Sequence, residues 1–268
     1  MTSSPEAENG SPKTSLTNTR LLKKDWIQMT NKTALITGGS AGLGRALVAA
    51  LSDEGWQVVT DGRDAARLEI LRRLPGADRI TAVAGDVTDA DHRDALLAAA
   101  GGRLDLLVHN ASALGPVSGD TRHRLLADVT PEDLQHVWRH NVGAPLVLTS
   151  LMLPLLTASG GVLLSISSDA AVEHYSGWGL YGASKAALDH LTLTFAAEIP
   201  AITAYSVDPG DMRTQMHQDW FPGEDISDRP LPETVVPHLL ALLGSRPPSG
   251  RYRAADFPAL RVAERTGA

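Results

Sequence analysis

The sequence predicts a single α/β domain: a doubly wound, mostly parallel sheet of the Rossmann type in three layers, helix, sheet and helix. From Asn31 onward, short apolar runs alternate strictly with longer amphipathic runs. Such alternation produces crossover units, whose parallel sheet is covered on both faces. The chain has 268 residues, 43% of them hydrophobic, so it is long enough to bury one large core.

The short apolar runs predict strands at residues 33–37, 57–61, 80–84, 104–110, 161–167 and 202–207, with a last short strand at 251–253. The amphipathic runs predict helices at residues 43–54, 65–74, 90–100, 131–156 and 180–198. The fourth helix has a clear start: Thr130 can cap it, Pro131 suits its first position, and two acids follow. Ligands of such folds bind beyond the carboxyl ends of the strands, so we expect the chemistry there.

Residues 1–30 differ from the rest. Thirteen of the first 20 are Ser, Thr, Asn, Pro or Gly, a composition that cannot bury enough apolar surface to offset the entropy of ordering. We predict a disordered extension, followed by one catalytic domain over residues 31–268. The alternative is that Leu21, Leu22, Trp26 and Ile27 dock on the body or on another subunit.

Composition excludes several functional classes. A net charge of −7 argues against nucleic acid or an anionic membrane as a partner. The chain has no cysteine, which excludes disulfides and thiolate catalysis. Its most apolar stretch, residues 146–156, is too short for a membrane span, and the first residues lack the apolar core of a secretory signal. We therefore expect a cytoplasmic protein. The histidines show no metal-ligand spacing, so no metal is expected.

A glycine-rich turn, Thr37-Gly38-Gly39-Ser40-Ala41-Gly42-Leu43-Gly44, follows the first predicted strand and opens the first helix. Glycines allow a sharp turn and let a pyrophosphate approach the N–H groups at the helix N-terminus. The position between strand and helix supports a nucleotide site. A purely structural turn is the alternative.

The end of the second strand, Asp61-Gly62-Arg63-Asp64, is where such folds contact the adenosine ribose. A carboxylate there binds the ribose 2′-OH of NAD, whereas an arginine pairs with the 2′-phosphate of NADP. Arg63 favours NADP(H). Two alternatives stay open: Asp61 takes the ribose, or Arg63 is a surface charge paired with Asp64.

Tyr181 and Lys185 are separated by slightly more than one helical turn, so they share a face. A tyrosine that exchanges protons at neutral pH needs a pKa below its usual value near 10, and a neighbouring ammonium favours the phenolate. Ser168, at the end of a predicted strand, could hydrogen-bond a substrate carbonyl; Ser167 is the alternative. The arrangement predicts proton transfer to or from a carbonyl–alcohol pair.

These motifs together resemble the short-chain dehydrogenase/reductase family, in its short single-domain branch, over about residues 32–255. The resemblance rests on the glycine-rich turn, on Asp86-Val87, on His109-Asn110-Ala111-Ser112, on Asn141, Ser168, Tyr181 and Lys185 in order and spacing, and on Pro209-Gly210-x-x-x-Thr214. His109 and Ser112 stand where the family usually has Asn and Gly. We expect a local repacking there without loss of activity. Gly62-Arg63 resembles the pair of NADP-preferring members.

The resemblance implies roles for these residues. Tyr181 is the general acid in reduction and the base in oxidation; Lys185 lowers its pKa and bonds the nicotinamide ribose; Ser168 polarises the carbonyl; and Asn141 interrupts its helix to hold a relay water. Cofactor contacts are implied for Gly38, Ser40, Gly42, Leu43, Gly44, Arg63, Asp86, Val87, Asn110, Tyr181, Lys185, Pro209, Gly210, Met212 and Thr214.

The substrate is less well determined. A lid over about residues 211–229, with Met212, Met216, His217, Trp220 and Phe221, suits an apolar or ring-bearing substrate, and Leu114, His174 and Trp178 are candidates for the other wall. The alternative is that these residues only close the lid. Arg122, His123 and Arg124 lie in a long loop and could meet an anionic group or simply be solvated.

We expect an NADP(H)-dependent carbonyl reductase or secondary-alcohol dehydrogenase, assembled as a homodimer or homotetramer through the helices that hold Asn141 and Tyr181. Two other functions stay open. One is a non-redox isomerase, dehydratase or lyase on the same scaffold. The other is a catalytically silent nucleotide-binding regulator.

Overall fold

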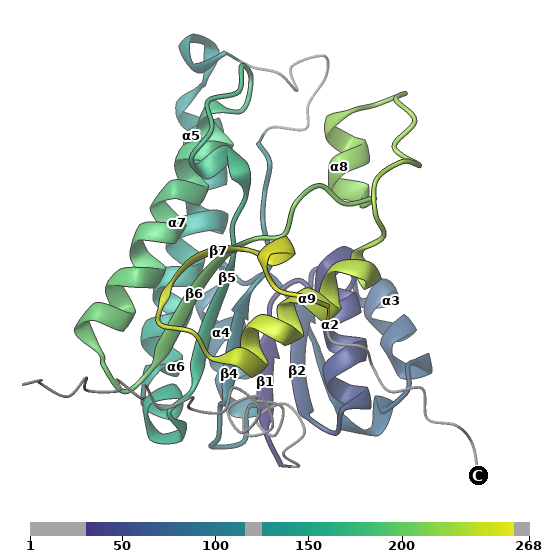
Figure 1. Ribbon diagram of the computed structural model, residues 1–268, viewed down its shortest axis with the longest axis vertical. Helices are drawn as coiled ribbons and strands as arrows, with labels where there is room; N and C mark the ends of the chain where they lie inside the picture. Colours follow the sequence, from purple (N-terminus) through teal and green to yellow (C-terminus); the bar gives the residue numbers. More distant parts are fainter. Residues whose placement is uncertain (1–30, 116–124, 260–268) are drawn as a thin grey trace, which may run out of the picture.

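Seven parallel strands form one sheet in the computed structural model, which describes residues 31–115 and 125–259 (Figure 1). They are β1 (Thr33–Ile36), β2 (Gln57–Gly62), β3 (Ile80–Ala84), β4 (Leu106–His109), β5 (Val162–Ile166), β6 (Thr203–Asp208) and β7 (Gly250–Arg253). Their order is β3-β2-β1-β4-β5-β6-β7, so the doubly wound fold is confirmed. The predicted extension at residues 1–30 and the basic cluster at residues 122–124 lie outside the described residues.

The central strands are buried on both faces. All residues of β1, β4 and β5 are buried, as expected of a parallel sheet with helices on each side. Side chains of one strand alternate between two cores: Ala34 and Ile36 join one hydrophobic cluster and Leu35 joins the other. The sheet therefore separates two apolar layers.

On one face of the sheet, α2 (Gly42–Asp53) packs against α9 (Pro232–Ser245). On the other face lie α4 (Ala90–Ala99), α6 (Ala144–Ser159) and α7 (Gly179–Glu198) (Figure 1). The helix α9 was not among the predicted helices, although Pro232 and Glu233 at its start and the apolar run after them are typical helix signals.

Two predicted helices are divided in the structure. The helix expected at residues 65–74 is α3 (Ala65–Leu68) followed by a 3₁₀ turn, Glu69–Arg73. The helix expected at 131–156 consists of α5 (Pro131–Trp138), a π-turn (Arg139–Gly143) and α6. Its predicted cap is present, because the Thr130 hydroxyl accepts a hydrogen bond from the Asp133 N–H at 3.2 Å and the Asp133 carboxylate accepts one from the Thr130 N–H.

The continuous helical segment Pro131–Ser159 is long and apolar enough to cross a membrane, judged by length and composition alone. In this fold it covers the sheet: Leu148, Met152 and Leu156 belong to the core. Its outer side carries the partly exposed side chains of Leu134, Trp138, Leu146 and Val147.

Candidate functional site

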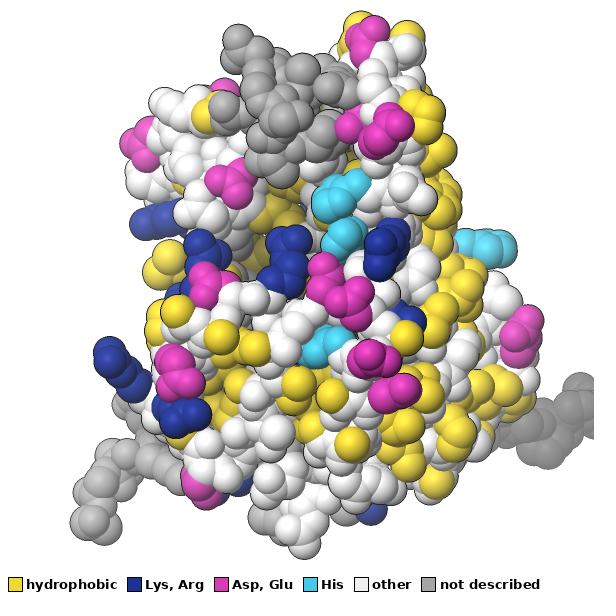
Figure 2. All heavy atoms as spheres, turned by 180° about the vertical axis from the view of Figure 1, so that it is seen from behind, with side chains coloured by type: hydrophobic (Ala, Val, Ile, Leu, Met, Phe, Trp, Pro, Cys, Tyr) yellow, Lys and Arg dark blue, Asp and Glu magenta, His cyan; other side chains and the backbone are white. Residues whose placement is uncertain are grey.

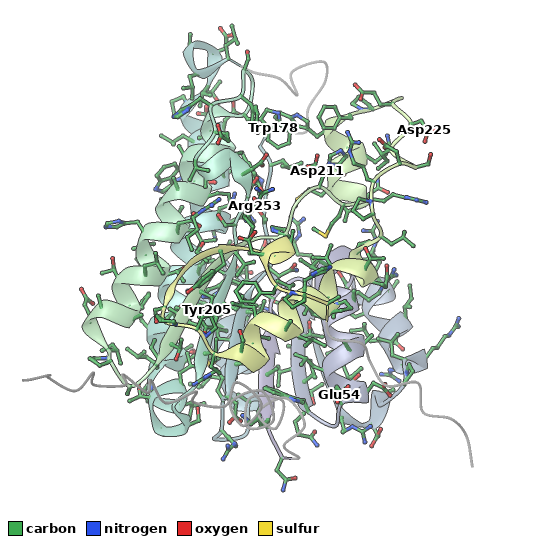
Figure 3. All side chains as sticks on the ribbon, viewed as in Figure 1. Glu54, Trp178, Tyr205, Asp211, Asp225 and Arg253 are labelled. Carbon is green, nitrogen blue, oxygen red and sulfur yellow. The ribbon has the colours of Figure 1, made fainter. Side chains whose placement is uncertain are left out.

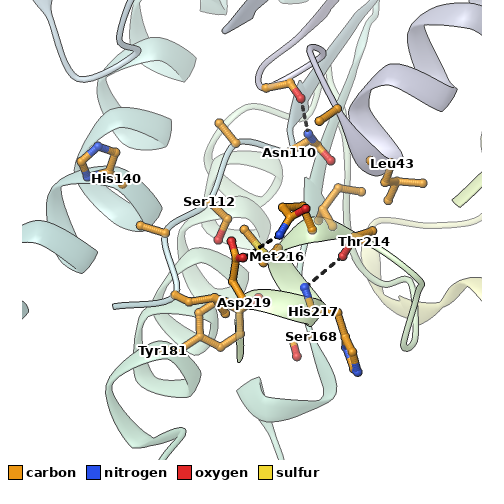
Figure 4. A pocket seen from close by; sticks show the side chains of 18 of the residues that line it. Leu43, Asn110, Ser112, His140, Ser168, Tyr181, Thr214, Met216, His217 and Asp219 are labelled. Atoms are coloured by element: carbon orange, nitrogen blue, oxygen red, sulfur yellow. Dashed lines mark hydrogen bonds between the residues drawn. The ribbon is translucent and has the colours of Figure 1, made fainter. Parts of the chain in front are cut away.

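A cavity of about 570 Å³ lies at the carboxyl ends of the strands, where the sequence places the chemistry (Figure 4). The predicted residues that line it are Gly38, Ser40, Gly42, Leu43, Arg63, Asp86, Val87, Asn110, Ser168, Tyr181, Lys185, Pro209, Gly210, Met212 and Thr214. Gly44 and Asn141 are not among the lining residues. Gly44 lies behind the turn, since a Cβ there would be 2.4 Å from both the Asn110 amide nitrogen and the Gly38 carbonyl oxygen.

The glycine-rich turn is shaped to receive an anion. Gly38 and Gly42 have φ angles of +72° and +54°, which side chains with a Cβ rarely adopt. Among the described residues no side chain caps the N-terminus of α2, so its first N–H groups are available to a phosphate. Asn110 supports the turn from β4 by donating to the Thr37 carbonyl at 2.9 Å and to the Gly38 carbonyl at 3.2 Å.

The Asp61 side chain is buried, and both of its carboxylate oxygens have partners inside the protein. It is 2% exposed; one carboxylate oxygen accepts the Gly38 N–H at 2.6 Å, and the other lies 3.1 Å from Nε2 of His92. Its carboxylate therefore holds the glycine-rich turn in place. Arg63 is exposed at the cavity wall. Asp64, which was the alternative partner for Arg63, pairs with Arg67 at 3.3 Å.

Tyr181 and Lys185 lie on the face of α7 that is turned to the cavity. The Lys185 ammonium donates to the Ile166 carbonyl at 2.8 Å and lies 5.5 Å from the centre of the Tyr181 ring. Burial lowers the pKa of Lys185 to about 8. Burial also raises the pKa of Tyr181 above its ordinary value, although hydrogen bonds with Ser112 and Ser168 act in the opposite direction. In this structure it is these hydroxyls, rather than the ammonium, that favour the phenolate.

Ser168 and Ser167 both line the cavity. The Ser168 hydroxyl donates to the Asp169 carboxylate at 3.0 Å and also hydrogen-bonds with Tyr181, which favours Ser168 as the serine that meets a substrate beside the phenol. The Ser167 hydroxyl is buried without a hydrogen-bond partner among the described residues.

Asn141 lies in the π-turn between α5 and α6 and is 1% exposed. Its amide bonds Ala113 twice, accepting from the N–H at 2.7 Å and donating to the carbonyl at 2.8 Å. It also donates to the Ser184 hydroxyl at 2.9 Å. The interrupted helix thus presents an amide that joins the segment after β4 to α7, directly behind Tyr181.

Ser112 lines the cavity, although it was not among the site residues predicted from the sequence. Its hydroxyl donates to the Asn141 side-chain oxygen at 3.2 Å and hydrogen-bonds with Tyr181. The sequence does indicate a special role for Ser112, because this serine replaces the glycine of the family motif. The neighbouring replacement, His109, is buried; its Nε2 lies 2.6 Å from the Thr149 hydroxyl, and burial lowers its pKa to about 3, so the ring is neutral.

The lid contains a short helix, α8 (Gln215–Trp220). Of the predicted substrate residues, Leu114, Trp178, Met212, Met216, His217 and Trp220 line the cavity, whereas His174 and Phe221 do not. Trp178 points from the body toward the lid (Figure 3), and its ring lies 4.2 Å from that of Trp220, centre to centre. Trp178 is also in edge contact with Tyr181 at 5.7 Å. The lid residues therefore close on the body and form an aromatic wall beside the phenol.

Comparison with known proteins agrees with this geometry. The family model described as short chain dehydrogenase matches residues 32–225. The chain belongs to the short-chain dehydrogenase family. Benzil reductase ((S)-benzoin forming) of Saccharomyces cerevisiae is 35% identical over 197 residues, 70% of this chain and 74% of the relative.

Solved structures of other family members match the whole fold. A short-chain dehydrogenase from Pseudomonas syringae superposes with a TM-score of 0.76 at 32% identity, covering 85% of this chain and 96% of its own. One from Shigella flexneri 2a, complexed with NADP, has a TM-score of 0.75 at 28% identity and covers 85% and 98%. These relatives show that the chain is a member of an oxidoreductase family.

Replacing Ser112 by Ala tests the contact that the family glycine cannot make. Losing one hydrogen bond to the phenolate costs about 1 kcal/mol, which raises the pKa of Tyr181 by somewhat less than one unit. The pH profile of the oxidation that the family resemblance implies should therefore move to higher pH by that amount. Ser150→Ala, which removes an exposed hydroxyl from α6, is the matched control. An unchanged profile for Ser112→Ala would contradict the assignment.

Proposed function

We propose that the protein is an NADP(H)-dependent oxidoreductase that interconverts a ketone or other carbonyl compound and the corresponding alcohol. One observation carries the proposal: Ser168, Tyr181 and Lys185 form one wall of the same cavity whose other end is the glycine-rich turn. A dinucleotide bound at the turn and a carbonyl bound at the phenol would share this space. Tyr181, Lys185, Ser168 and Asn141 are the proposed catalytic group.

The residues of the cavity fit a dinucleotide phosphate. Gly38, Ser40, Gly42 and Leu43 would hold the pyrophosphate at the uncapped start of α2, with Gly44 behind them. Arg63 would meet the 2′-phosphate, since Asp61 is held by Gly38 and His92. Asp86 and Val87 would contact the adenine, and Asn110, Tyr181, Lys185, Pro209, Gly210, Met212 and Thr214 the nicotinamide half. When bound, the cofactor supplies or accepts the hydride.

The chain's own residues supply position and the proton. Ser168 hydrogen-bonds the carbonyl oxygen and stabilises the negative charge that develops there. Tyr181 donates its hydroxyl proton to that oxygen in reduction and takes it back in oxidation. Lys185 lies against the Tyr181 ring, where it would bond the nicotinamide ribose, and the hydroxyls of Ser112 and Ser168 oppose the burial that disfavours the phenolate. Asn141 keeps the Ser112–Ala113 segment against α7.

The cavity suits an apolar, ring-bearing substrate. Trp178 and Trp220 provide aromatic surface beside Tyr181, and Met212 and Met216 provide adaptable apolar contacts. The relationship to a benzil reductase supports a ketone next to an aromatic ring as a substrate to be tried first.

On the face shown in Figure 2, Lys/Arg and Asp/Glu side chains are interspersed over the described residues, without a continuous basic surface for nucleic acid.

Tyr181→Phe should abolish turnover of benzil with NADPH, because the proton donor is lost, while NADPH binding stays nearly unchanged. General acid catalysis contributes about 10²- to 10⁴-fold, which sets the smallest expected loss of kcat. Binding is followed by nicotinamide fluorescence. Tyr252→Phe is the control, because it removes a hydroxyl that donates to the Pro248 carbonyl and does not line the cavity.

Normal turnover by the Tyr181→Phe variant would refute the assignment. If the wild-type protein converts a substrate while the cofactor keeps its redox state, the reaction is a non-redox isomerisation, dehydration or elimination. If neither NADPH nor NADH binds, the oxidoreductase proposal fails.

Arg63→Ala should weaken NADPH binding by about 10- to 100-fold, since a hydrogen-bonded charge contact is worth about 1.5–3 kcal/mol. NADH binding should change little. Arg72→Ala, in the same segment and paired with Glu69 on the surface, should leave both affinities unchanged. A loss that is equal for the two cofactors would contradict recognition of the 2′-phosphate by Arg63.

The outer side of α5 and α6 supports a homo-oligomer. Leu134, Trp138, Leu146 and Val147 are each between 38% and 46% exposed, and a second copy of the chain would cover them. We expect a dimer or tetramer by light scattering. Leu146→Glu combined with Val147→Glu should shift the mass to a smaller species, and a monomeric wild-type protein would refute this expectation.

A further inference from the structure

Arg251 connects the last strand of the sheet to the catalytic wall. From β7, its Nη2 donates to the Ser168 backbone carbonyl at 2.8 Å and its Nε donates to the Asp189 carboxylate at 2.9 Å. The partners lie 83 and 62 residues away in the chain. The other Asp189 oxygen accepts a hydrogen bond from Ser206 of β6, the residue paired with Arg251 across the two strands.

The arrangement needs an arginine. A planar guanidinium carries several N–H donors in a fixed fork, so it can hold a carbonyl and a carboxylate at once, whereas a lysine ammonium acts as a point charge. The Arg251 side chain is 25% exposed and the Asp189 side chain 12%. The pair is therefore largely shielded from water, where a charge affects its neighbours more strongly than at the surface.

Asp189 lies one helical turn after Lys185 in α7, and its negative charge favours the protonated form of that lysine. Arg251 offsets this charge at a distance of 2.9 Å. Among the described residues, the titratable or charged groups around the catalytic wall are His109 of β4, Asp169 after β5, Tyr181 and Asp189 of α7, Asp208 of β6, and Arg251 and Arg253 of β7. Of these, His109 is neutral, because burial lowers its pKa to about 3.

We propose that Arg251 is a positioning residue of the catalytic site: its guanidinium fixes the backbone of Ser168 and offsets the charge that Asp189 presents to Lys185. Part of this inference rests on the proposed function, because the effect on turnover requires that Ser168 and Lys185 be catalytic. The effect on Lys185 itself does not. The strand β7 follows the proposed catalytic residues in the sequence, and Arg251 makes it part of the site.

The charge effect can be measured without a substrate. The chain has five lysines, so protein labelled with ¹³C at lysine Cε gives few signals, and Lys185→Met identifies the one of interest. Arg251→Gln leaves Asp189 unbalanced and should raise the Lys185 titration midpoint by about one pH unit. Asp189→Asn leaves Arg251 unbalanced and should lower it by a similar amount. The double variant should return close to the wild-type midpoint.

A second variant separates charge from geometry. Arg251→Lys keeps the positive charge, so the Lys185 midpoint should stay close to the wild-type value. It cannot hold both Ser168 and Asp189, so kcat for benzil reduction should fall about 10-fold with KM little changed. Arg103→Gln, which breaks an Arg–Asp pair with Asp105 at the opposite end of the sheet, is the control and should alter neither quantity.

The outcomes distinguish this inference from the proposed function. An unchanged Lys185 midpoint in folded Arg251→Gln and Asp189→Asn overturns the charge effect. A wild-type kcat in Arg251→Lys overturns the positioning of Ser168. If the midpoints move in opposite directions but the wild-type protein reduces no carbonyl compound, the charge effect on Lys185 stands and the proposed reaction fails.

Discussion

The junction between β1 and β4 supports everything else in this site. Here the strand order reverses across the sheet, and the chain leaves β1 toward one face and β4 toward the other, which leaves a crevice beyond the strand ends. Thr37 and Asn110 bind them together: the Thr37 N–H donates to the Val108 carbonyl at 3.0 Å, and the Asn110 amide donates back to the Thr37 carbonyl. The glycine-rich turn leaves from one strand and the Ser112–Ala113 segment from the other, so both halves of the cavity are set from one point.

Burial acts against the charged forms of the two titratable groups on the proposed catalytic wall. Removing Tyr181 and Lys185 from water disfavours the charged form of each, raising one pKa and lowering the other. The structure compensates with oriented groups: the Ile166 carbonyl for the ammonium, and the hydroxyls of Ser112 and Ser168 for the phenol. Functional sites often combine perturbed pKa values with a specific set of such partners.

Local patterns were sufficient to predict the sheet, whereas most of the cavity residues were predicted through the family resemblance. Apolar runs and turn residues lie within a few positions of one another, and all seven expected strands are present, with ends shifted by at most two residues. The division of the 131–156 helix at the π-turn was predicted only at Asn141, through the family resemblance, because the apolar pattern continues through the turn. The helix α9 was missed although its start carries ordinary signals.

The sequence by itself determined the fold class, the glycine-rich turn and the residue types of the proposed catalytic wall, because each depends on short spacing along the chain. Tertiary structure decided which partner each polar group has. From the sequence, Asp61 stays open as an alternative ribose ligand; in the structure, Gly38 and His92 occupy its two oxygens. Ser112, Arg251 and the pKa of Tyr181 depend on groups brought together from distant segments, and burial and hydrogen bonding act only on that assembled geometry.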